Sequence, residues 1–463
     1  MSDTKKTFNK ICLARIVLEA ATPIAVGSGK KDIMTDSQVI KDVNGLPYIP
    51  GTSLAGVIRH MIGQQDADTL FGYQNRDDGM GSRIIFTHAK MIGHDGKVVE
   101  GLMNEGSKND PFYQRFSALP IRQHVRINEK GTAANRGKFD EEVVYKGTRF
   151  CFEIEIIQEE NSGDEISRIL ETIRKQTFRL GGGTRSGFGE LQIISLKTVN
   201  LDLKTASDLD RYLSKSSSLN DDAFWANCKN ENNNDPESGW ITYQLKLNPD
   251  DFFLFSSGLG SETADITPVT ESIIVWGDDS RPKFVDENIL IPAASVKGAI
   301  AHRVAFYYNK LSQVFADEIN IDEFENHVGK NNTAVRALFG SEGERIGNEM
   351  KNQQRGNVIF SDLISGKLQQ KLLNHVCIDR FTGGAMEGML FSEEVVYAHD
   401  QQFEMTILVN ESNLLAEEKE KIMESFERSL NDIVSGMLPL GGGVNRGHGS
   451  FNGSFEPKNY LKD

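Results

Sequence analysis

The sequence predicts an α+β protein made of two tandem ferredoxin-like domains, each with an inserted hairpin. Two observations lead to this fold class. Several short motifs occur twice along the 463 residues, in the same order. Within each copy, strand-like and helix-like segments follow the order β-α-β-β-α-β. Repetition in one order indicates a duplicated structural unit, because loops can change in length while the order of elements stays fixed.

The clearest repeat is FDEEVVY at 139–145, which returns as FSEEVVY at 391–397 with six of seven positions identical. Four further pairs keep the same order: IPGTSLAG (49–56) and IPAASVKG (291–298), LFG (70–72) and LFG (338–340), HVRI (124–127) and HVCI (375–378), and LGGG (180–183) and LGGG (440–443). We therefore expect a first domain at residues 8–200 and a second at 238–458. Residues 201–237 are rich in Ser, Asn and Asp, and predict a linker.

The elements of the first copy follow from its residue patterns. Segments rich in β-branched and aromatic residues predict strands at 11–26, 82–92, 143–157 and 188–199. Apolar residues at helical spacing predict helices at 52–65 and 167–178. The first helix follows Pro50-Gly51, so Thr52 or Ser53 is expected to cap it. The second copy repeats the pattern, with a helix at 295–311 and a strand at 404–409.

The formal net charge of −15 argues, taken alone, against nucleic-acid binding, because phosphates are neutralised by Lys and Arg. Binding is local, however, and acidic stretches can lie on faces away from an RNA groove. No apolar run is long enough to span a membrane, and the N-terminus carries no recognisable export signal. The four cysteines lie far apart, which favours the reducing cytoplasm.

Two glycine-rich loops each lie between a predicted helix and a predicted strand: GGGTRSGFG at 181–189 and GGGVNRGHG at 441–449. Glycine allows positive φ angles and close approach of a ligand, and successive amides can form an anion-binding nest. The alternative is a tight helix-to-strand turn, but an arginine in both loops favours phosphate binding. The residues expected to contact RNA here are Gly182, Arg185, Gly442 and Arg446.

A hydroxyl-rich first turn begins the first predicted helix of each copy. Helix N-termini attract phosphates through their dipole and free amides. The simpler alternative is that the hydroxyls only cap the helix, and both roles can coexist. The expected RNA contacts on these helices are Ser53, Arg59, Ser295, Lys297 and Arg303.

Residues 124–139 and 375–391 each predict a strand, a tip and a returning strand. A projecting hairpin with apolar side chains near its tip can wedge between stacked bases. An ordinary surface hairpin is the alternative, and these residues alone favour it. The expected RNA contacts on the two hairpins are His124, Arg126, His375 and Met386.

The ordered set of capped helices, glycine loops and EEVVY hairpins resembles the RAMP superfamily of CRISPR-associated proteins. Two fused copies are similar to the double backbone subunit of type III effector complexes, of subtype III-D. The resemblance implies that each copy has an RRM-like palm that holds a guide RNA and a thumb hairpin that pushes between guide and target. It also implies three further partners: a single-stranded target RNA, other RAMP-family subunits and a large polymerase/cyclase-type subunit.

In active members of this family, a loop aspartate ahead of the first helix drives metal-dependent cleavage of the target RNA. The resemblance implies that Asp36 occupies this position, where it could bind Mg²⁺ (or Mn²⁺) or accept a proton from the attacking 2′-hydroxyl. The loop of the second copy is expected to be two residues longer, with Glu271 as the aligned carboxylate and Asp265 as the other candidate. We therefore expect metal-dependent endoribonuclease activity from at least the first domain.

Three alternatives to this function stay open. A catalytically silent, structural RNA-binding backbone subunit would show the same repeats. A guide-processing endonuclease of the same superfamily usually relies on an early histidine, and the first histidine here, His60, lies inside a predicted helix. An unrelated ferredoxin-like metabolic enzyme is not supported by any cofactor fingerprint.

Overall fold

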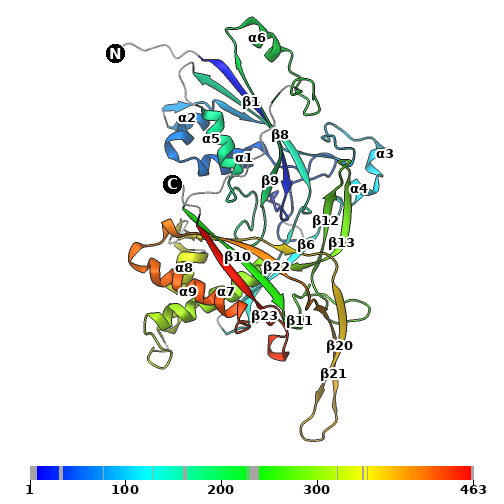
Figure 1. Cartoon of the computed structure of the whole chain (residues 1–463), viewed down its shortest axis with the longest axis vertical. Helices are drawn as coiled ribbons and strands as arrows, with labels where there is room; N and C mark the ends of the chain where they lie inside the picture. Colours follow the sequence, from blue (N-terminus) through cyan, green and yellow to red (C-terminus); the bar gives the residue numbers. More distant parts are fainter. Residues whose placement is uncertain are drawn as a thin grey trace.

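The computed structural model describes residues 8–30, 35–76, 78–128, 130–159, 164–226, 228, 239–320, 322–341, 343–346, 349–351 and 353–459. Residues 31–34 of the loop that carries Asp36, and residues 229–237 of the expected linker, lie outside this description. The described helices and strands form two similar bodies that follow each other along the long axis of the molecule (Figure 1).

The first body is built on an antiparallel sheet with the strand order β4-β8-β1-β9, and β5 also pairs with β8. Its strands are β1 (Phe8–Ala20), β4 (Ile84–Phe86), β5 (Lys90–Met91), β8 (Arg149–Glu159) and β9 (Leu191–Asp202). Helices α1 (Gly51–Met61) and α5 (Glu165–Arg174) contact each other and bury Ile58 and Ile169 in the core. This is the β-α-β-β-α-β unit that the sequence predicts.

The second body repeats this arrangement strand for strand, with the order β18-β22-β10-β23. Its strands are β10 (Trp240–Pro249), β18 (Val358–Phe360), β22 (Phe403–Asn410) and β23 (Phe451–Asn459). Its helices are α7 (Ala293–Leu311), α8 (Thr333–Phe339) and α9 (Ala416–Val434), which lie together beside the sheet (Figure 1). In β10, Tyr243, Leu245 and Leu247 are fully buried, while Gln244 and Lys246 between them are partly exposed, as the two-residue period of a strand requires. The predicted tandem duplication is confirmed.

The N-terminus of α1 differs from the prediction. Pro50 is the N-cap residue, and no side chain caps the helix. Thr52 and Ser53 already lie in the first turn, where the Ser53 amide donates to the Pro50 carbonyl, so the predicted side-chain cap is wrong. Gly63, with a φ of 88°, separates α1 from α2 (Gln64–Phe71), so the predicted single helix is two helices.

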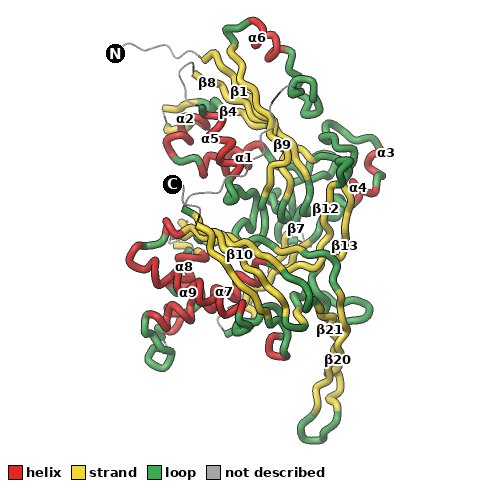
Figure 2. The backbone as a smooth tube through the Cα atoms, viewed as in Figure 1, coloured by secondary structure: helices red, strands yellow, loops and turns green. Residues whose placement is uncertain are grey.

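Each body carries one long inserted hairpin, as predicted. The strands of these hairpins are β6 (Ile121–Ile127) and β7 (Ala133–Glu142) in the first body, and β20 (Gln369–Ile378) and β21 (Ala385–Tyr397) in the second. The second hairpin extends from the molecule as a narrow arm (Figure 2). Phe381 at its tip is 99% exposed, so this aromatic side chain has no packing role within the chain.

A further hairpin, formed by β12 (Thr270–Trp276) and β13 (Pro282–Ile291), joins the two bodies. At the corresponding place the first copy has only a short turn, closed by a bridge between Lys41 and Pro47. Ile274 of the hairpin belongs to the core of the first body, and the Trp276 indole donates to the Gly147 carbonyl at 2.7 Å. This insertion therefore fixes the second body onto the first.

The segment between the bodies covers the outer face of the first sheet. It contains the short helix α6 (Ala206–Leu213) and then Trp225, which is fully buried against Ile11, Leu13 and Leu201. Ion pairs from Arg15 and Lys215 to the buried carboxylate of Glu153 lie under this segment. The sheet face that an RRM uses for stacking bases is thus occupied in the first body.

The remaining elements are short connections. They are β2 (Tyr73–Asn75), β3 (Asp78–Met80), α3 (Glu105–Lys108), α4 (Pro111–Gln114), β11 (Phe252–Phe253), β14 (Gly340–Ser341), β15 (Glu344–Ile346), β16 (Glu349–Lys351), β17 (Gln354–Arg355) and β19 (Leu363–Ile364), with 3₁₀ turns η1 (Phe324–His327), η2 (Gly329–Asn331), η3 (Glu411–Asn413) and η4 (Val444–Arg446). Among the helices of the described residues, none combines the length and apolar composition needed to cross a membrane.

Candidate nucleic-acid interface

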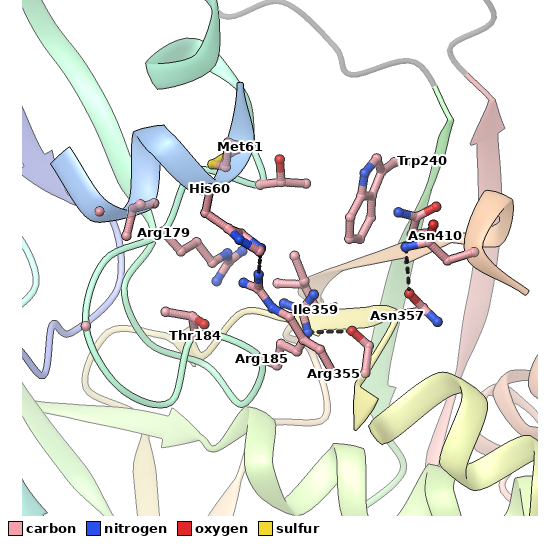
Figure 3. Close-up of a pocket in the computed structure, with 16 residues that line it drawn as sticks. His60, Met61, Arg179, Thr184, Arg185, Trp240, Arg355, Asn357, Ile359 and Asn410 are labelled. Atoms are coloured by element: carbon pink, nitrogen blue, oxygen red, sulfur yellow. Dashed lines mark hydrogen bonds between the residues drawn. The ribbon is translucent and has the colours of Figure 1, made fainter. Parts of the chain in front are cut away.

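A cavity of about 610 Å³ lies between the two bodies, and Figure 3 shows its lining. One wall comes from α1 and the first glycine loop, with His60 and Arg185. The other comes from the end of β17 and from β10 and β22, with Arg355, Trp240 and Asn410. The cavity therefore combines basic side chains with an aromatic ring, the two kinds of group that hold single-stranded nucleic acid.

Three basic side chains form what we call the cation cluster: Arg185 and Arg355, which line the cavity, and Lys297, which lies beside the first glycine loop. Arg185 Nε donates to the Gly356 carbonyl, and Lys297 Nζ donates to Ser186 Oγ at 3.1 Å. Within the described part of the chain, none of the three pairs with a carboxylate. Burial and the charge of Arg355 lower the pKa of Arg185 to about 10, and burial and the charge of Arg185 lower the pKa of Lys297 to about 8. Like charges that lie close together without a counter-anion favour binding of a polyanion.

Binding of a single-stranded RNA oligonucleotide should weaken as the pH rises from about 7 to about 9 at constant ionic strength. Lys297 has a pKa near 8, so it loses its charge in this range, and one phosphate contact loses its strength. The variant Lys297→Arg stays charged and should bind with less dependence on pH. Filter binding across this pH range measures both. Identical pH dependence for wild type and variant would contradict the role given to Lys297.

Backbone amides of the glycine loops form hydrogen bonds within the protein. The amide of Gly182 donates to the Ala25 carbonyl, and the amide of Gly442 donates to the Leu254 carbonyl, both at 2.7 Å. These two amides are therefore not available to an anion, so the contacts expected at Gly182 and Gly442 cannot be amide–phosphate hydrogen bonds. The loops hold their arginine side chains in place, and the arginines supply the charge.

The two loop arginines have different surroundings. Arg446 pairs with Glu393, whose carboxylate is fully buried and also accepts from His375 and His448 at 2.8 and 3.0 Å. Burial alone would raise the pKa of Glu393, but the His448 hydrogen bond and the charge of Arg446 hold it below its ordinary value. Arg446 is thus neutralised within the protein, whereas Arg185 has no carboxylate partner in the part of the chain that the structure describes. The first glycine loop is the stronger candidate for phosphate binding.

Two of the expected helix contacts are already engaged. Arg59 donates to the Gly72 carbonyl and pairs with Asp68 at 2.8 Å, and Arg303 pairs with Asp432 at 2.8 Å. Each of these guanidinium groups therefore makes its contacts within its own body of the protein. Ser53 is partly exposed and Ser295 is exposed in the first turns of α1 and α7, where a phosphate could reach them. On the hairpins, Arg126 is exposed on β6 and Met386 is 41% exposed on β21.

Asp36 lies beside the base of the first hairpin. Its amide donates to Asp140 Oδ1 at 2.8 Å, and the Asp140 amide lies 3.4 Å from Asp36 Oδ2. In the second copy, Asp265 accepts from the amide of Ser392 at 2.8 Å and from its hydroxyl at 3.1 Å. Asp140 and Ser392 occupy the same position of the repeated heptapeptide. Asp36 and Asp265 are therefore equivalent.

Backbone pairing confirms this equivalence and corrects the expected alignment. The bridge between Gly27 and Val39 in the first copy corresponds to that between Ser256 and Pro268 in the second, so the two loops have the same length. The extra residues of the second copy lie in the β12–β13 hairpin. Glu271, the carboxylate aligned from the sequence, is in that hairpin.

Glu271 is 8% exposed and pairs with Arg122 of β6, which also pairs with Asp362 at 2.9 Å. This places the Glu271 carboxylate in a buried ion cluster between the copies. Burial raises its pKa, although the charge of Arg122 opposes the shift. Arg122 was missed by sequence reasoning, because nothing in HVRI or its flanks distinguishes a buried arginine from a surface one. Arg355 and Trp240 were missed because they lie outside the repeated motifs.

Within the described residues, no group of three or more His, Cys, Asp or Glu side chains forms a preassembled metal site. The first copy offers the two carboxylates of Asp36 and Asp140, and the second offers Asp265 with the Ser392 hydroxyl. Mg²⁺ is commonly held by one or two carboxylates together with substrate phosphates. These oxygen donors fit such an ion when RNA supplies the rest.

Comparison with known proteins agrees with the internal duplication. The model of the RAMP superfamily matches residues 17–192 and again residues 270–452. The chain is also similar to the CRISPR system endoribonuclease Csm3 of Methanocaldococcus jannaschii, with 27% identity over 205 residues, which cover 40% of this chain and 78% of that protein. The two matched regions each contain one of the long inserted hairpins, one glycine loop and one first helix.

Proposed function

The chain belongs to the RAMP superfamily in two successive copies, and on this premise we propose that it is a guide-RNA-binding backbone subunit of a type III CRISPR effector complex that cleaves guide-complementary target RNA. The cation cluster, which lies between the copies and has no carboxylate partner among the described residues, is the observation that carries the proposal. Because two copies are fused, we assign the complex to subtype III-D. Its other members would be further RAMP-family subunits and a large polymerase/cyclase-type subunit.

We propose that the guide RNA binds where the two copies contact each other. Arg185 comes from the first copy and Lys297 from the second, so one stretch of RNA backbone would contact both. Contacts of this kind hold phosphates and carry no sequence information. Sequence would be read by pairing between guide and target, as in other RNA-guided systems. The acidic balance of the chain does not oppose this, because the cluster is locally basic.

Cleavage is proposed at Asp36 and at Asp265. Either carboxylate can accept the proton of an attacking 2′-hydroxyl while the 2′-oxygen displaces the 5′-oxygen from phosphorus. The products are a cyclic phosphate and a 5′-hydroxyl. Mg²⁺ or Mn²⁺, held by Asp36 and Asp140 or by Asp265 together with phosphate oxygens, would neutralise the charge that develops on the phosphate.

The second candidate function is a catalytically silent backbone subunit. Two observations favour it: the described residues contain no preassembled metal site, and backbone amides already occupy carboxylate oxygens of Asp36 and Asp265. Such a subunit would retain guide and target RNA but would leave cleavage to its partners. Loss of cleavage in aspartate variants that still bind target separates the two functions.

Replacing Arg185 with alanine should weaken retention of the guide roughly 10- to 100-fold, which corresponds to the 1.5–3 kcal/mol of a hydrogen bond to a charged group. Arg446→Ala should have a smaller effect, because Glu393 already neutralises that arginine. Arg428→Ala on α9, an exposed arginine paired with Glu424, is the matched control and should retain guide normally. Binding of labelled guide RNA at several salt concentrations measures all three. Equal retention by the Arg185 and Arg428 variants would contradict the proposal.

A further inference from the structure

A histidine and a glutamate meet at the base of the first hairpin. His124 of β6 lies opposite Phe139 of β7, and the two rings stack with centroids 4.8 Å apart. His124 Nε2 lies 3.2 Å from Glu141 Oε1, and the side chain of His124 is 14% exposed. The ring therefore has a fixed plane and one nitrogen facing a carboxylate. This arrangement is the one that orients a histidine for proton transfer at its other nitrogen.

The second copy builds the same unit. His375 of β20 stacks on Phe391 with centroids 4.8 Å apart, and its Nε2 bonds Glu393 Oε1 at 2.8 Å. Its side chain is 27% exposed. In the part of the chain that is described, Nδ1 of His124 and of His375 makes no hydrogen bond to another residue. Each copy thus holds a partly accessible imidazole whose Nε2 faces a glutamate carboxylate, at a distance of 3.2 Å in the first copy and through a hydrogen bond in the second.

Both units lie directly beside the proposed cleavage loops. Glu141 pairs through its backbone with Ser37, the residue after Asp36, and Glu393 pairs in the same way with Ile266, the residue after Asp265. The neighbouring position in the glycine loop differs between the copies: it is Phe188 beside His124 in the first copy, and His448, which bonds Glu393, in the second. The histidine–glutamate pair is kept in both copies beside the loop aspartate.

We propose that His124 and His375 are the general acids of the two cleavage sites, a role that rests on the proposed endoribonuclease function. The 2′-hydroxyl gives its proton to the loop aspartate as the bond from the 2′-oxygen to phosphorus forms. The bond from phosphorus to the 5′-oxygen breaks, and the departing oxygen takes the proton from Nδ1 of the imidazolium. Glu141 and Glu393 hold the ring through Nε2. The products are a cyclic phosphate, a 5′-hydroxyl and a neutral histidine, which solvent reprotonates.

The test compares two target RNAs in the assembled complex with the full chain and its guide. One target has natural oxygen throughout. The other carries sulfur in place of the 5′-oxygen at the bond that Asp36→Ala leaves uncut. A thiolate leaves without protonation, so the sulfur target does not need a general acid. His124→Gln, which keeps a side-chain amide next to Glu141, should cut the oxygen target about 10²- to 10⁴-fold more slowly, and the sulfur target at close to the wild-type rate.

Phe139→Leu is the matched control, because it disturbs the stack and leaves the imidazole in place; it should affect both targets equally. His375→Gln should behave as His124→Gln does, at the second bond. Wild-type cleavage of the oxygen target by His124→Gln, or equal slowing on both targets, overturns the assignment while the proposed function stands. Absence of all cleavage by the wild-type complex overturns the proposed function and the assignment together.

Discussion

Replacing Asp36 with alanine should abolish one cleavage of a guide-complementary target RNA, and replacing Asp265 should abolish a different one. The two carboxylates lie at matching positions of loops that have the same length, so each is expected to serve one site. Removing a base or a metal ligand commonly costs a factor of about 10² or more in rate. Target binding should persist, because pairing with the guide supplies that energy.

Denaturing gels of end-labelled target, cut by the assembled complex with Mg²⁺, measure both variants. Glu271→Gln is the control for the second copy, because the structure places this carboxylate in the ion cluster with Arg122 and not beside Ser392. It should leave both bands in place. A full wild-type ladder from the Asp36 and Asp265 variants would instead support the catalytically silent subunit.

Replacing Arg122 with alanine should destabilise the chain by about 3–5 kcal/mol, because it leaves the buried carboxylates of Glu271 and Asp362 without their counter-charge. Arg122 belongs to the first hairpin, and both partners belong to the second body. The loss should therefore weaken the contact between the copies as well as the fold of either one. Urea unfolding followed by tryptophan fluorescence reports this contact, because Trp276 lies in it.

Arg115→Ala provides the matched control. Arg115 also pairs across the copies, with Asp286, but both side chains are substantially exposed. Exposed pairs contribute about 0.2–1 kcal/mol, so this variant should unfold close to the wild-type urea concentration. If the Arg122 variant unfolded at the same concentration as the Arg115 variant, the buried cluster would not hold the copies together.

The fold could be predicted from the sequence because short local motifs recur in the same order in both copies. The strand and helix patterns of the first copy, and their recurrence at 295–311 and 404–409 with the motif pairs, were enough to give β-α-β-β-α-β twice. The cap of α1 could not be predicted, because Pro50 and the hydroxyl residues after it are all compatible with the N-cap position, and only backbone geometry selects Pro50.

The sites were predicted unevenly. The sequence singled out both loop arginines as candidates, and the family resemblance singled out Asp36. Neither could show that Arg185 and Lys297 meet, because they come from different copies. The sequence aligned Glu271 with Asp36, because Thr-Glu-Ser matches Thr-Asp-Ser and the inserted hairpin is invisible without its pairing. The burial of Glu271 depends on a contact between bodies, which no local pattern encodes.

The most direct test of the account is to identify the RNA that accompanies the chain when it is purified from its host. A guide-binding backbone subunit should carry RNA of defined length that contains CRISPR repeat sequence, together with other RAMP-family subunits. That RNA should be released as salt rises, since phosphate contacts at the cation cluster hold it. A preparation of the assembled complex that contains no RNA, or only random fragments of cellular RNA, would contradict the central claim.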